Sequence, residues 1–240
     1  MQAGKTKGTK MKIGIIVAMD KELAGMKDLL TDAKEETDGN FTFHTGRLND
    51  KQIIALKCGI GKVNAAVGAV EMIHKYHPDY IISSGVAGGI DYDVCVMDVV
   101  VANQLVYHDA DTGKDGEGID IVNPYPVSDY LLKKAEEMSE RQGLVNEGRI
   151  RIGTICTGEQ FIVERSTLEG IKQRYPLGLA VDMESCAIAH ACKIMNVPFI
   201  SFRIISDTIG AGANEEQYEK FWATLADNSF YMLHRFIEEI

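Results

Sequence analysis

The chain has 240 residues, of which 45% are hydrophobic and 25% are charged, and its formal net charge is -10. This composition is typical of a globular protein that buries about 70–75% of its unfolded surface and needs no disulfides or metals to hold its fold. The acidic balance argues against a nucleic-acid partner, which requires a basic face, and against docking on anionic lipid.

Short apolar, β-branched runs alternate with amphipathic helical patterns along the chain. In chain order we predict a strand at 11–19, a helix at 20–30, a hairpin of strands at 41–48 and 51–59, a helix at 62–77, strands at 79–85 and 97–109, a helix at 129–143, a strand at 149–158, a helix at 166–175, a strand at 179–183, a helix at 184–195, a strand at 198–208 and a final helix at 215–240. This alternation predicts an α/β fold with three layers, α/β/α, around a central mixed and largely parallel sheet.

The cysteines and the start of the chain bear on its compartment and domain organisation. Five cysteines, without a C-x-x-C pair, are typical of reduced thiols in the cytoplasm and not of a disulfide framework or a zinc site. No apolar run approaches the length of a membrane span. Residues 1–10 are basic and polar and precede no separate apolar region of a signal peptide, so we expect a disordered extension followed by one domain over 11–240.

Three predicted strands end in an acidic residue, and strand ends are where open α/β sheets bind ligands. These residues are Glu22, Glu184 and Asp207. Any one of them alone would be read as a helix N-cap or first-turn acid, but that reading is weaker for three acids gathered on one rim. Glu184 follows a stretch that otherwise reads as core. Its neighbour Asp182 we interpret as a helix cap or a solvent-facing residue.

Other candidate motifs are less specific. The stretch GIGKVN fails as a dinucleotide loop because Asn64 occupies the third glycine position. The stretch GVAGG predicts either close approach of the backbone to a ligand or a tight turn. A lone histidine with loop acids, as in YHDAD, is more often structural than metal-binding, so we expect no metal. Phe161 follows a strand end, where its ring would either stack on a planar ligand or serve as a hydrophobic staple.

Seven motifs occur in a fixed order: IGIIVAMDKE, CGIGKVNAA, GVAGG, YHDAD, TGEQFI, VDMES and RIISD. Together they closely resemble the bacterial 5′-methylthioadenosine/S-adenosylhomocysteine nucleosidases of the nucleoside phosphorylase superfamily, from Met11 to the final helix. The resemblance implies hydrolysis of the N-glycosidic bond of these nucleosides, and of 5′-deoxyadenosine, to adenine and the 5′-substituted ribose, as in methionine salvage. It also implies a cytoplasmic homodimer that needs no cofactor.

The resemblance implies a chemical role for several acids. Glu22 matches the acid/base that activates the attacking water, and Asp207 matches the acid that protonates purine N7. Glu184 matches the carboxylate that binds the ribose hydroxyls, with Met183 packed on the sugar. The chemistry accounts for these residue types, because an anionic purine leaves poorly without a proton and water needs a base on the opposite face of the ribose.

Further positions match substrate-binding residues of the family. Phe161 matches the ring stacked on adenine, and the backbone of Ile162 matches the group that reads the adenine edge. Arg203 and Ser206 match polar partners near the water and near the acid. The remaining matches, in the ribose and 5′-substituent pocket, are Met19, Ile60, Ala87, Gly88 and Tyr218.

Two features depart from the family pattern. Val86 stands where the nucleosidases that resemble this chain carry a serine that helps to hold the water, a task that Ser84 could take over. The loop 112–118, TGKDGEG, is polar and acidic where the family carries aromatic and apolar residues. This loop leaves open a wetter 5′ pocket that favours 5′-deoxyadenosine, aminofutalosine or another polar adenine nucleoside.

Two other classes of function compete with the hydrolase. A purine nucleoside phosphorylase would need arginines for its phosphate, where this chain instead has the acidic AMDKEL. A nucleoside-binding protein on the same fold would need neither Glu22 nor Asp207. The sequence therefore favours a hydrolase, with a small nucleoside as its partner and no nucleic acid or membrane.

Overall fold

A computed structural model of the chain describes residues 10–110, 124–142, 148–209, 214–224 and 231–240. Its elements follow one another as β1 (Lys12–Val17), α1 (Asp20–Lys27), β2 (Thr31–Asp38), β3 (Phe41–Leu48), β4 (Lys51–Lys57), α2 (Lys62–Tyr76), β5 (Tyr80–Gly89), β6 (Val99–Tyr107), β7 (Tyr125–Pro126), α3 (Asp129–Gln142), β8 (Ile150–Thr157), α4 (Arg165–Arg174), β9 (Gly178–Asp182), α5 (Ser185–Met195), β10 (Phe199–Thr208), α6 (Asn214–Thr224) and α7 (Tyr231–Glu239). The predicted N-terminal extension, apart from the exposed Lys10, and the polar loop 112–118 lie outside the described residues.

The described strands form one mixed sheet in the order β10-β6-β8-β9-β5-β1-β4-β3-β2, with β7 paired to β6. Parallel pairings fill its centre, joining β1 to β4 and β5, β5 to β10, and β8 to β6 and β9. Because β10 pairs with β5 as well as with β6, the strands β5, β10, β6, β8 and β9 close into a ring. The predicted α/β class is confirmed, and the closure brings distant strand ends together.

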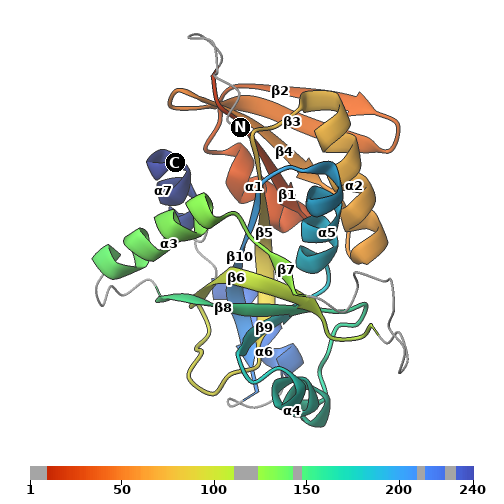
Figure 1. The fold of residues 1–240 in the computed structure, drawn as a ribbon, viewed down its shortest axis with the longest axis vertical. Helices are drawn as coiled ribbons and strands as arrows, with labels where there is room; N and C mark the ends of the chain where they lie inside the picture. The colour runs from red at the N-terminus through yellow and green to blue at the C-terminus, as the bar shows by residue number, and fades with distance from the viewer. Residues whose placement is uncertain (1–9, 111–123, 143–147, 210–213, 225–230) are drawn as a thin grey trace.

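Helices cover the sheet on both sides (Figure 1). Helices α2 and α5 pack against each other on one side, while α3 and α7 contact each other on the other side. Strands covered on both faces need apolar side chains on both, which explains why runs such as KIGIIV read as continuously apolar. Every residue of β10 is buried, including the polar Arg203, Ser206 and Asp207. Polar groups this deep must be hydrogen-bonded.

The structure differs from the predicted elements in several places. The two-residue strand β7 was not predicted, and β5 continues through GVAGG to Gly89 instead of ending at 85. Strand β2 was not predicted, because TDAKEETD is polar, is exposed along its whole length and lacks the alternation that indicates a strand; its pairing with β3 holds it at the sheet edge. The predicted helix 20–30 ends at Lys27. The described residues of the predicted helix 215–240 belong to two helices, α6 and α7.

Two further expectations concern the cysteines and the membrane. All five cysteines are free, and four of them are buried, as expected for reduced thiols. Among the helices of the described residues, none combines the length and the apolar composition that crossing a membrane requires.

Candidate active site

A cavity that opens to solvent lies at the carboxyl ends of β1, β5, β9 and β10. Ligands of α/β sheets bind at this edge. Every predicted site residue except Arg203 lines the cavity. The structure adds five lining residues that were not among the predicted ones: Ala18, Val86, Gln160, Val181 and Asp182.

Asp207 and Ser206 both face the cavity although they are consecutive in a strand, where side chains normally alternate between faces. The pairing of β10 with β5 shifts register between Ile205 and Asp207, and such a bulge re-aims a side chain. The Ser206 hydroxyl donates to Asp207 Oδ1 at 2.7 Å. A Cβ atom on Gly88 would lie 3.2 Å from Asp207 Oδ2, so a glycine there leaves room for the acid.

Glu22 is held by backbone amides at the start of α1. Its Oε2 accepts hydrogen bonds from the N–H groups of Ala18 and Met19, both at 2.9 Å, and its Oε1 accepts one from Val86 at 3.0 Å. The acid thus caps its own helix and also faces the cavity. Asp20, by contrast, forms an exposed ion pair with Lys57 and takes no part in the site.

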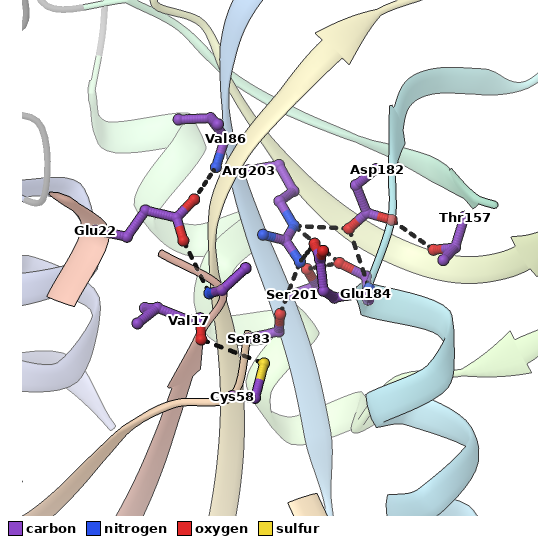
Figure 2. A network of polar contacts seen from close by, with 12 residues as sticks. Val17, Glu22, Cys58, Ser83, Val86, Thr157, Asp182, Glu184, Ser201 and Arg203 are labelled. Carbon is purple, nitrogen blue, oxygen red and sulfur yellow. Dashed lines mark hydrogen bonds and ion pairs between the residues drawn. The ribbon is translucent and has the colours of Figure 1, made fainter. Parts of the chain in front are cut away.

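Arg203 lies behind the cavity between the acids (Figure 2). Its Nε lies 2.8 Å from Asp182 Oδ2, and its Nη2 lies 3.6 Å from Glu184 Oε2. A Cβ atom on Gly85 would clash with both Arg203 Nη1 and Glu22 Oε1, so the guanidinium also faces Glu22. The arginine, 1% exposed, is therefore the shared counter-charge of three carboxylates.

Serine hydroxyls complete the environment of this arginine. Arg203 Nε donates to Ser185 Oγ at 2.9 Å, and Nη2 donates to Ser83 Oγ at 3.0 Å. Ser185 Oγ in turn lies 2.7 Å from Ser201 Oγ. Ser84, which could have replaced the missing serine at Val86, is buried and does not line the cavity. Residues two apart in a strand share a face, so Ser84 lies on the same side of β5 as Val86 but further from the carboxyl end of the strand, where the cavity is. The structure therefore does not place Ser84 where it could take over the task of the missing serine.

Asp182 corrects another expectation. Its Oδ2 accepts the Ser185 N–H at 3.1 Å, so it does cap α5, but it does not face solvent. The Thr157 hydroxyl donates to its Oδ1 at 2.5 Å, and Arg203 pairs with its Oδ2. The neighbouring Glu184 points elsewhere, because its Oε1 accepts the Gly61 N–H at 3.0 Å from the start of α2.

Burial raises the pKa of two of the cavity acids, Glu22 and Glu184. Burial raises the pKa of Glu22, while Arg203 and the three backbone N–H groups oppose this effect. Burial likewise raises the pKa of Glu184 to about 7, against the attraction of Arg203 and with the repulsion of Asp182. A raised pKa near neutrality is a property of acid–base catalysts and arises here from the same causes.

The opposite wall of the cavity is aromatic and apolar. The rings of Phe161 and Tyr218 meet edge-on with centroids 5.4 Å apart, and the Tyr218 hydroxyl lies 3.7 Å from Met19 Sδ. Phe161 is 49% exposed while Ile162 is buried. An exposed ring at a cavity wall suits a planar ligand, so the staple interpretation of Phe161 is not needed.

The arrangement can bind a planar, partly apolar molecule. Its acids can donate a proton to that molecule or remove a proton from a nucleophile that attacks it. Four acids line this space: Glu22 from α1, Asp182 from β9, Glu184 at the start of α5 and Asp207 from β10. Among the described residues that line it, none is a lysine or an arginine, and Arg203 is occupied by carboxylates. The site therefore favours growing positive charge on a ligand and disfavours an anion.

Comparisons with known proteins agree with this geometry. A profile of the phosphorylase superfamily matches residues 12–238. The 5′-methylthioadenosine/S-adenosylhomocysteine nucleosidase of Maridesulfovibrio salexigens is 38% identical over 233 residues, 96% of this chain and 100% of the relative. The S-adenosylhomocysteine nucleosidase of Streptococcus pyogenes, solved with 5-methylthiotubericidin, has a TM-score of 0.87 and 29% identity over 98% of this chain and 99% of that one. The futalosine hydrolase of Helicobacter pylori has a TM-score of 0.86 and 29% identity over 96% and 98%.

Proposed function

This chain belongs to the 5′-methylthioadenosine/S-adenosylhomocysteine nucleosidases of the phosphorylase superfamily, and from this membership we propose that it hydrolyses the N-glycosidic bond of those two nucleosides. The products are adenine and the 5′-thioribose. The observation that carries the proposal is one cavity in which Glu22, Glu184 and Asp207 face an aromatic wall, with no lysine or arginine among its described lining residues.

In this proposal each acid has a separate task. Asp207 gives its proton to N7 of the purine as the bond to the ribose breaks, and Ser206 orients it. Glu22 takes a proton from the water that attacks the opposite face of the ribose. Glu184 accepts the two ribose hydroxyls, and the surplus of carboxylates over Arg203 stabilises the oxocarbenium-like ribose. One water is consumed, and solvent returns the proton from Glu22 to Asp207.

The remaining lining residues support binding. Phe161 supplies the face on which adenine stacks, and the backbone of Ile162 reads its edge. Met183 packs on the sugar, while Met19, Ile60 and Tyr218 line the 5′ side. The short segment of Ala87 and Gly88 lets the substrate approach the backbone closely.

Hydrolysis is favoured over phosphorolysis by charge. A phosphate dianion would need free arginines or lysines, whereas Arg203 is paired with Asp182 and Glu184. The carboxylates of Glu22 and Glu184 would also repel the phosphate dianion. Water, being neutral, meets no such barrier.

The experiment that tests the proposal is incubation with methylthioadenosine, with and without phosphate, followed by chromatography of the products. We expect adenine and free methylthioribose at the same rate in both. A sugar 1-phosphate that appears only with phosphate would replace the hydrolase with a phosphorylase. Turnover of aminofutalosine or 5′-deoxyadenosine alone would move the preference to another 5′ group, an outcome that the similarity to a futalosine hydrolase makes worth measuring.

We further propose that residues 11–240 form a single nucleosidase domain in a cytoplasmic homodimer. The superfamily profile over 12–238 supports the single domain, and the five free cysteines support the reducing compartment. Ile60 lines the cavity mouth, and beside it helix α2 carries the exposed side chains of Val63 and Val67, 73% and 46% exposed, one turn apart. Exposed apolar side chains at i and i+4 suit a partner helix.

We expect sedimentation velocity to give twice the mass of one chain, because association would remove this apolar face of α2 from water. Replacing Val63 with Lys should shift the protein toward the monomer. The same replacement at the exposed Leu177, which does not belong to α2, should leave the mass unchanged. A wild-type monomer at micromolar concentration would contradict the dimer.

A further inference from the structure

We propose that Lys62, Asp109 and Glu159 form a latch that positions the loop 158–164, and with it Phe161 and Ile162, for recognition of the base. The inference rests on the proposed function, because it deepens the role of the aromatic wall. The three latch residues are positioning residues that act through the loop, not groups that touch the substrate.

The latch joins three separate segments by charge-assisted hydrogen bonds. Lys62 Nζ donates to both oxygens of Asp109, at 2.9 and 2.8 Å. The backbone N–H of Glu159 donates to Asp109 Oδ2 at 2.8 Å. The Glu159 side chain in turn accepts the backbone N–H of Lys62 at 3.1 and 3.0 Å. The segments after β6 and after β8 and the first residue of α2 are thereby joined in one closed cycle of hydrogen bonds.

The loop that carries the aromatic wall has few other polar restraints, although Ile162 packs in a buried apolar cluster with Leu168 and Val181. Within the described chain, no hydrogen bond to another residue involves 160–163, which lie between Glu159 and the start of α4. Among the described aromatic rings, the Phe161 ring meets that of Tyr218 edge-on, and it stays 49% exposed. Glu159, two residues before Phe161, is therefore the hydrogen-bonded anchor on one side of the ring, while the buried Ile162 anchors the other side by apolar packing.

The Lys62–Asp109 pair of the latch is partly shielded from solvent, while Glu159 is exposed. The side chains of Lys62 and Asp109 are 27% and 28% exposed, and Lys62 Nζ lies 5.4 Å from the centre of the Tyr107 ring. Burial alone would raise the pKa of Asp109, but the hydrogen bonds from Lys62 and from the Glu159 N–H hold it below its usual range. A partly buried, charge-assisted pair is stronger than a fully exposed one.

The latch does not touch the proposed catalytic acids. Glu22 is anchored by Ala18, Met19 and Val86, and Asp207 belongs to β10. Loss of the latch should therefore weaken binding of the base and leave the chemical step in place. This separates it from a general structural role, which would lower activity and stability together.

The test uses Lys62→Met, Asp109→Asn and the double variant, with Lys62→Arg as the conservative replacement. The matched control is Lys75→Met, because Lys75 pairs with Asp38 at 2.6 Å at the other end of the same helix. For the two single variants we expect KM for methylthioadenosine and Kd for free adenine to rise about five- to tenfold, with kcat within about twofold of wild type. In the double variant KM and Kd should rise no further than in either single variant, because each single substitution already breaks the same latch. Lys62→Arg should restore most of the affinity, and Lys75→Met should change nothing.

Amide hydrogen exchange gives a readout that does not depend on activity. Exchange over 158–164 should accelerate in Lys62→Met and Asp109→Asn but not in Lys75→Met. Unchanged KM, adenine affinity and exchange would overturn the latch, as would additive losses in the double variant. If the wild type neither turns over methylthioadenosine nor binds adenine, the proposed function fails instead, while the exchange experiment still tests the latch.

Discussion

Replacing Asp207 with Asn is expected to slow adenine release by about 10²–10⁴-fold, the usual contribution of a general acid. The amide cannot give a proton to N7, so the purine would have to leave as an anion. The shape is conserved, and the Ser206 hydroxyl at 2.7 Å can still donate to the amide oxygen. Binding of methylthioadenosine should therefore persist. Single-turnover kinetics combined with calorimetric binding separates the two effects.

The control for this variant is Ser206→Ala, which removes the orienting hydroxyl but leaves the acid. It should cost less than Asp207→Asn and should lower kcat with little change in binding. Circular dichroism must show an intact fold in both. Adenine release by Asp207→Asn at the wild-type rate would contradict the assignment of Asp207 as the acid.

Replacing Glu22 with Gln is expected to lower kcat by a similar factor of about 10²–10⁴ while nucleoside binding remains. An amide cannot take the proton of the attacking water. It also has one acceptor oxygen for the three backbone N–H groups that Glu22 now accepts. An unpaired buried donor costs about 1–3 kcal/mol, so thermal unfolding should show a modest loss of stability alongside the kinetic loss.

The pH dependence gives an independent check on Glu22. Because burial raises its pKa above the ordinary 4.5, the protonated form, which cannot act as a base, is populated at pH values above 4.5. The rate of the wild type should fall as pH drops through that raised pKa, with a second contribution from Glu184, whose pKa is about 7. The Gln variant should lose the contribution of Glu22. A pH profile identical to wild type, or normal turnover, would mean that another group activates the water.

The same raised pKa values affect the stability of the free protein. Glu184 binds its proton more tightly when folded than when unfolded. Its contribution to stability is thus complete below the unfolded pKa of 4.5 and is lost as pH rises toward 7. At neutral pH and above, the buried Glu184 therefore lowers the stability of the fold, which is typical of sites where function and stability compete.

Much of the fold and of the site could be read from local pattern. Buried strands such as β1 were predicted because a strand covered on both faces must be apolar throughout. Glu22, Glu184 and Asp207 stood out because each lies at the carboxyl end of such a strand or shortly after it, and the structure places all three on one cavity. The edge strand β2 escaped, since all its residues are exposed and periodicity reports burial, and the two-residue strand β7 was also not predicted.

What the sequence by itself determined is therefore the α/β alternation, the acidic strand ends and the order of motifs that identifies the family, because these are properties of contiguous residues. Only the tertiary structure decided which acid meets which partner. Asp182 pairs with Arg203, Ser83 lies 120 residues from the same arginine, and Lys62 is latched to Asp109 and Glu159. The bulge that turns Ser206 and Asp207 to one face arises from pairing with β5. Such contacts form only when folding brings distant segments together, and the local sequence of one segment does not indicate which other segment it will meet.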